Sequence, residues 1–139
     1  MVSRRDCWRT CHLLVGALGL ILFLLQGQYM ARVLGMETLP DGARMMYRSA
    51  HIYLMLASLA NVCAGYFMTP ERKLDALQRL ISILLLACPA LLIWSFFTES
   101  ASATLQRPIG SYTLYLLFGS GVLLLLQEGY RRLTSRADD

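Results

Sequence analysis

The residues best suited to chemistry follow the turn signal Pro40-Asp41-Gly42. Four polar residues recur there at helical spacing and therefore share one helix face: Arg44, Tyr47, Arg48 and His51. Tyr29 and Tyr112 are expected at the same level of the molecule. Guanidinium, phenol and imidazole groups together can bind a phosphate, a carboxylate or a quinone head group. The same side chains also serve as interfacial anchors of membrane helices, and both interpretations stay open.

Part of this stretch resembles a known family. Arg44, Arg48 and His51 look like a fragment of the Arg-rich motif of the membrane-associated eicosanoid and glutathione metabolism superfamily, whose members are four-span chains of this size. The resemblance implies a glutathione-transferase-like membrane enzyme. Here the segment 52–54 is Ile-Tyr-Leu, where the motif has an asparagine and acidic residues. The resemblance is therefore an alternative that assigns no residue a role.

Haem or copper binding is a lesser alternative, and the identity of any cofactor stays open. His12 is expected at the start of the first span on the inner face, and His51 at the start of the second span on the outer face. They therefore lie about a bilayer apart and cannot share one haem iron. Met45 and Met46 lie close to His51, and thioether and imidazole ligands suit Cu(I). These three residues are the candidates for a metal site, although methionines also fill irregular gaps in helix bundles.

The composition decides which elements position these residues. The 139 residues are 56% hydrophobic and 16% charged, with a mean hydropathy of +0.49. A soluble domain is about 45–50% apolar and about 25% charged, so the composition disfavours an ordinary soluble domain. Four apolar segments are long enough to cross a bilayer, and their backbone groups must be paired within helices. The sequence predicts an all-α integral membrane protein, a bundle of four transmembrane helices within a single domain, 1–139, with spans at about 12–34, 47–68, 77–98 and 109–127.

The basic residues predict the orientation. Most of the 13 Lys and Arg residues lie before the first span, between the second and third spans, or after the fourth. The positive-inside rule places these regions, and both termini, in the cytoplasm of what we interpret as a bacterial inner membrane. The expected partners are bilayer lipid, with other membrane subunits or self-association left open. Nucleic acid is not expected, because no basic patch is interleaved with aromatic residues.

Small residues predict how the helices pack. One face of the second span carries small or amide side chains at helical spacing: Ala57, Asn61, Ala64 and Gly65. Such residues allow close approach, and Asn61 is expected to hydrogen-bond across to another helix. Similar packing roles are expected for four glycines outside this span: Gly16, Gly19, Gly119 and Gly121.

The function class follows from what these segments lack. The centres of the apolar runs carry no Lys, Arg, Asp or Glu, which disfavours ion-coupled transport. The short connections leave no room for a catalytic domain, and no nucleophile–base pair or complete metal set is apparent. The sequence therefore favours a non-enzymatic accessory subunit, or a lipid- or cofactor-binding module, whose Arg, Tyr and His residues lie at the outer ends of the helices.

Overall fold

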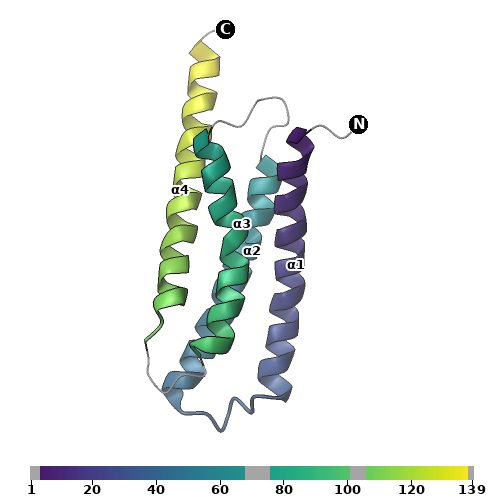
Figure 1. Ribbon diagram of the computed structural model, residues 1–139, viewed down its shortest axis with the longest axis vertical. Coiled ribbons are helices and arrows are strands. Elements are labelled where there is room, and N and C mark those ends of the chain that lie inside the picture. The colour runs from purple at the N-terminus through teal and green to yellow at the C-terminus, as the bar shows by residue number, and fades with distance from the viewer. Residues whose placement is uncertain (1–3, 68–75, 101–105, 138–139) are drawn as a thin grey trace.

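The computed structural model describes residues 4–67, 76–100 and 106–137. Within them the chain forms four helices: α1 (Arg4–Arg32), α2 (Asp41–Phe67), α3 (Ala76–Thr98) and α4 (Pro108–Ala137) (Figure 1). All four are long and apolar enough to cross a membrane. The predicted all-α architecture with four membrane helices is confirmed.

Each helix begins before its predicted span and α4 also continues beyond it, whereas α1 ends slightly earlier than predicted. Local residues explain several of these boundaries. Asp41 opens α2, where its carboxylate faces the positive end of the helix dipole, and the Arg44 amide bonds the Pro40 carbonyl at 3.0 Å. Pro108 opens α4, at a position where its missing N–H is not needed. After α1, Gly35 takes a φ of 55°, which turns the chain towards α2.

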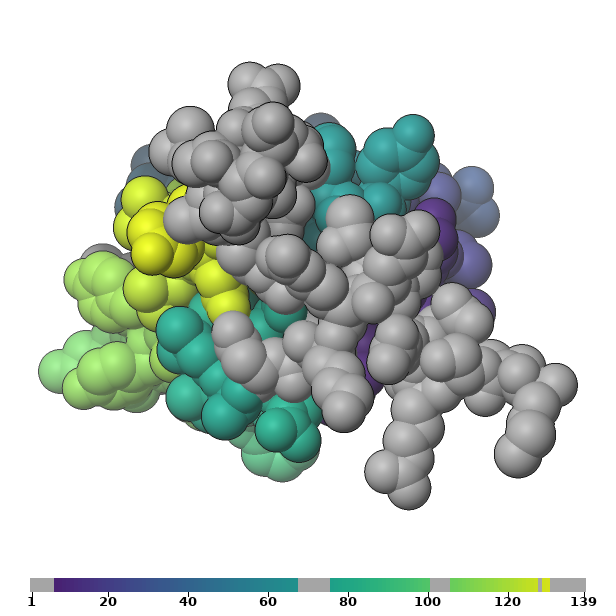
Figure 2. All heavy atoms as spheres, turned by 90° about the horizontal axis from the view of Figure 1, so that it is seen from above, coloured from purple at the N-terminus to yellow at the C-terminus, as the bar shows by residue number. Residues whose placement is uncertain are grey.

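The bundle is arranged around two central helices. α1 packs mainly on α2, and α4 packs mainly on α3, while α1 and α4 make no contact within the described residues. Figure 1 shows α1 and α4 on opposite flanks, and Figure 2 shows the same separation from above. Both termini lie at one end of the bundle, which we call the termini end. We call the opposite end, which carries the Arg32–Asp41 connection, the far end.

The contact between α1 and α2 depends on glycines on both helices. A side chain on Gly16 would place its first carbon 2.6 Å from Val62 Cγ2 and 2.8 Å from the Ser58 carbonyl oxygen. A side chain on Gly65 would come within 2.8 Å of Leu13 Cγ. The absence of these side chains therefore permits the approach of the two backbones, as the small-residue pattern predicted.

Apolar side chains cover the flanks of the bundle. In α1, Leu18 and Leu24 are exposed, and in α4 so are Leu125 and Leu126. In water this surface would be unfavourable, whereas in a bilayer it is solvated by acyl chains. The apolar helices thus indicate contact with membrane lipid.

Candidate functional site

The structure separates half of the predicted outer-face residues. Arg44 forms an ion pair with the carboxylate of Asp41 on its own helix. Arg48 is exposed on α2, and Tyr112 is 69% exposed on α4. Since Arg44 is paired locally and Arg48 lies in the open, the two arginines do not form a pocket with each other in the described part of the chain.

Of the other three predicted residues, Tyr29 lines a groove between α1 and α3 near the far end. His51 contacts Gln26 of this groove, and Tyr47 contacts Phe96 of α3. The groove encloses about 200 Å³. Its walls are almost wholly apolar: Leu22, Leu25, Leu54, Ile93 and Phe97. Gln26 and Tyr29 are the polar residues that line it. A mostly apolar groove with a few polar groups is typical of a small-molecule site.

His51 is linked to this groove through Gln26. The two side chains meet at 3.2 Å, between His51 Nδ1 and Gln26 Oε1, and the imidazole stacks on Phe23 with ring centroids 4.0 Å apart. Gln26 is buried, and its amide oxygen is occupied by His51. The Gln26 amide nitrogen, which can only donate, is therefore the atom that can form a hydrogen bond to a ligand in the groove.

Tyr29 and Tyr47 meet through the phenylalanines of α3. Tyr29 makes edge contacts with Phe96 and Phe97 at centroid distances of 6.4 and 6.1 Å. Tyr47 is buried against Phe96 at 5.1 Å. Edge-to-face pairs hold aromatic rings in defined orientations, so this cluster fixes the wall beside Tyr29. Neither phenylalanine was singled out from the sequence, because an apolar run gives no sign of which rings face a groove.

A buried carboxylate, also missed from the sequence, joins α3 to α4 at the far end. Glu99 accepts hydrogen bonds from the amides of Ile109 (2.5 Å) and Gly110 (2.8 Å), and from the Ser95 hydroxyl. Burial alone raises the pKa of Glu99, but these bonds and the charge of Arg107 outweigh it and lower the pKa below its ordinary value. Glu99 thus acts as an ionised cap on α4. The signal available was a lone acid shortly before a proline that opens a helix.

Arg107 extends this junction to α2. Its Nη1 donates to the Ser49 hydroxyl, and its guanidinium lies 5.9 Å from the centre of the Tyr53 ring. The arginine therefore connects the start of α4 to the first turns of α2, next to the stripe that carries Tyr47 and His51. Glu99 and Arg107 thus join α2, α3 and α4 at the far end, and neither residue lines the α1–α3 groove.

A second polar network lies among α1, α2 and α3 towards the termini end. Pro89 has no N–H, so it leaves the carbonyl of Leu85 without its usual partner within α3. The Asn61 amide nitrogen donates to this carbonyl at 2.9 Å and also to the Ala57 carbonyl at 2.9 Å. The predicted bond from Asn61 across to another helix is confirmed. The Asn61 oxygen lies 2.8 Å from Nδ1 of fully buried His12.

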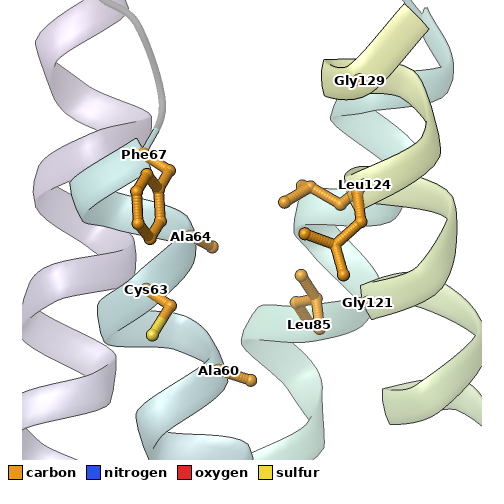
Figure 3. Close-up of a pocket in the computed structure, with 9 residues that line it drawn as sticks. Ala60, Cys63, Ala64, Phe67, Leu85, Gly121, Leu124 and Gly129 are labelled. Carbon is orange, nitrogen blue, oxygen red and sulfur yellow. The ribbon is translucent and has the colours of Figure 1, made fainter.

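The larger groove, about 520 Å³, lies between α2 and α4 near the termini end (Figure 3). Ala60, Cys63, Ala64 and Phe67 line one side, while Gly121 and Leu124 belong to the other, and Leu85 of α3 lies between them. A side chain on Gly121 would meet nothing within 4 Å. Its described lining residues offer a thiol but no other polar side chain, and this part of the groove can hold an apolar chain without orienting a head group.

Metal ligands are not clustered in the described part of the chain, where no group of three or more His, Cys, Asp or Glu residues is placed to hold an ion. Among the candidates for copper, Met45 is 69% exposed whereas Met46 is buried, so the two thioethers face different surroundings. No protein-family model, no curated protein and no solved structure matches this chain.

Proposed function

We propose that this small membrane protein is a non-enzymatic module that binds a lipid-soluble cofactor and serves as an accessory subunit of a larger membrane system. The observation that carries the proposal is the α1–α3 groove, in which apolar walls surround two polar side chains, Gln26 and Tyr29. Gln26 is held by its hydrogen bond with His51, and Tyr29 is held by its edge contacts with Phe96 and Phe97.

The size and chemistry of the groove favour a quinone-type head group. About 200 Å³ is below the usual volume of a drug-sized pocket, so only a head group fits and an apolar tail extends into the bilayer. The Tyr29 hydroxyl and the Gln26 amide nitrogen are both donors, and a quinone offers two carbonyl acceptors. Phe97 provides an aromatic wall against which a flat ring can pack.

The remaining predicted residues have supporting roles in this proposal. Tyr47 holds Phe96 in place, and Tyr112 and Arg48 are interfacial anchors. The distribution of Lys and Arg supports an orientation with both termini in the cytoplasm and the groove in the outer half of a bacterial inner membrane. Reporter tags at each terminus and near Leu39 test this orientation, and a cytoplasmic signal from Leu39 would reverse it.

Extraction of co-purifying lipids tests the ligand. Wild-type protein is purified in nanodiscs, and its organic extract is analysed for quinones by mass spectrometry. The double variant Gln26→Leu/Tyr29→Phe removes both donors while keeping similar volumes, and Tyr112→Phe is the matched control on the exposed face of α4. Each neutral hydrogen bond contributes about 0.5–1.5 kcal/mol, so the double variant should retain about tenfold less quinone. Equal amounts in wild type and a normally inserted double variant would overturn the proposal.

A further inference from the structure

His12 is completely buried in a membrane-spanning helix, and one of its ring nitrogens has no hydrogen-bond partner among the described residues. Its Nδ1 is paired with Asn61, while its Nε2 is buried without a partner in the described structure. No feature of the proposed head-group site uses this residue, because that site lies towards the far end. The surroundings of His12 determine its tautomer and its protonation state.

The Asn61 amide determines the tautomer. Its nitrogen donates to two backbone carbonyls, those of Ala57 and Leu85, so its oxygen must be the atom that faces His12. An amide oxygen can only accept, and the proton therefore lies on His12 Nδ1. Nε2 then carries a bare lone pair. Because Pro89 leaves the Leu85 carbonyl dependent on Asn61, the amide cannot rotate without losing that bond.

The charged and titratable groups near His12 do not favour a second proton on its imidazole. On α1, Arg9 lies one turn away and donates from Nε to the Gly65 carbonyl, and Cys11 adjoins His12 in sequence. On α2, Cys63 is exposed and lines the α2–α4 groove, and on α3, Arg79 is exposed. No carboxylate among the described side chains faces the imidazole. A proton on Nε2 would thus add a charge and a donor with no acceptor to a buried apolar site.

We propose that His12 is a pH-sensitive latch, whose protonation at Nε2 releases the first half of α1 from α2 and α3. In the neutral form, the Nδ1–H bond to Asn61 holds the three helices together. In the charged form, the buried cation is stable only if α1 moves to admit water to Nε2. The released segment contains the close contact of Gly16 with α2, so opening also loosens the packing between these two helices.

The rate of thermal unfolding in nanodiscs tests the latch. From about pH 8 to about pH 5.5, on either side of the ordinary histidine pKa, the rate should rise about tenfold for wild type. His12→Asn keeps a donor for Asn61 but does not titrate in this range, so its rate should stay constant. His51→Asn removes the other histidine, and whatever it does to the rate at about pH 8, the rise towards about pH 5.5 should remain. A pH-independent rate in wild type, or an equal rise in His12→Asn, would overturn the proposal.

A second measurement does not depend on any variant folding. Nitrogen chemical shifts of ¹⁵N-histidine-labelled wild type distinguish the two neutral tautomers and the cation. At about pH 8 both histidines should show a protonated Nδ1, since each Nδ1 faces an amide oxygen, and His12 should become a cation on acidification. A buried histidine that holds its proton on Nε2 would contradict the network that sets the latch.

Discussion

The contact of α2 with α1 and the contact of α2 with α4 use the same residue types in opposite ways. Against α1, glycines at 16 and 65 have no room for a side chain, and a buried polar network closes the interface. Against α4, a side chain on Gly121 would meet nothing, and a groove of about 520 Å³ remains. Small residues permit close packing, but a second feature, here the Asn61–Leu85–His12 network, must accompany them before two helices close.

Enlarging the glycines should have the largest effect and tests this comparison directly. Gly65→Leu forces a large side chain against Leu13 and the backbone of α1, and should destabilise the protein by about 1–3 kcal/mol. Gly121→Leu is the matched substitution in the open groove and should change stability by less than about 0.5 kcal/mol. Unfolding by denaturant in detergent micelles measures both. Equal losses would show that the two interfaces do not differ in this way.

Removing Asn61 should have an effect of similar or smaller size, and it can be partly reversed. Asn61→Leu leaves the Leu85 carbonyl and His12 Nδ1 without partners, which should cost about 1–3 kcal/mol. Pro89→Ala restores an N–H that can bond the Leu85 carbonyl within α3. The double variant should therefore be more stable than the sum of the single effects predicts. If the two changes in unfolding free energy simply add in a double-mutant cycle, then Asn61 does not compensate for the N–H that Pro89 lacks.

The smallest effect is expected at the far end and depends on pH. The folded-state pKa of Glu99 lies below its ordinary value of 4.5, so the carboxylate stabilises the folded state above that pH. As pH falls through the lower, folded-state pKa, this contribution is lost. Glu99→Gln should therefore reduce stability by about 1 kcal/mol at neutral pH, as for a lost helix cap, and should flatten the acidic limb of the stability curve. An unchanged acidic limb in Glu99→Gln would assign acid sensitivity to other groups.

The architecture could be predicted because membrane helices must satisfy their own backbone and be apolar over a bilayer's width. Asn61 could be predicted as a cross-helix donor, since an amide within a span needs a partner. The packing roles expected for Gly16 and Gly19 hold, but those of Gly119 and Gly121 find no contact within the described residues, because the sequence does not say which helix a face meets.

The candidate site was only partly predictable for the same reason. Helical spacing places Arg44, Arg48 and His51 near one stripe, but it cannot show that Asp41 neutralises Arg44 or that Gln26 binds His51. Glu99 precedes the α4 amides that hold it by only ten and eleven residues, but its role depends on the approach of two helix ends. Contacts between distant segments are decided by the tertiary arrangement.

Photolabelling with an azido-quinone tests the proposed ligand site most directly, because it compares the two grooves in one experiment. Protein in nanodiscs is irradiated with the probe, digested and mapped by mass spectrometry. We expect labelled peptides from 22–29 of α1 and 93–97 of α3, with labelling suppressed by excess unlabelled quinone and reduced in Gln26→Leu/Tyr29→Phe. Labelling confined to 60–67 of α2 and 121–129 of α4, or labelling that excess quinone does not suppress, would contradict the account.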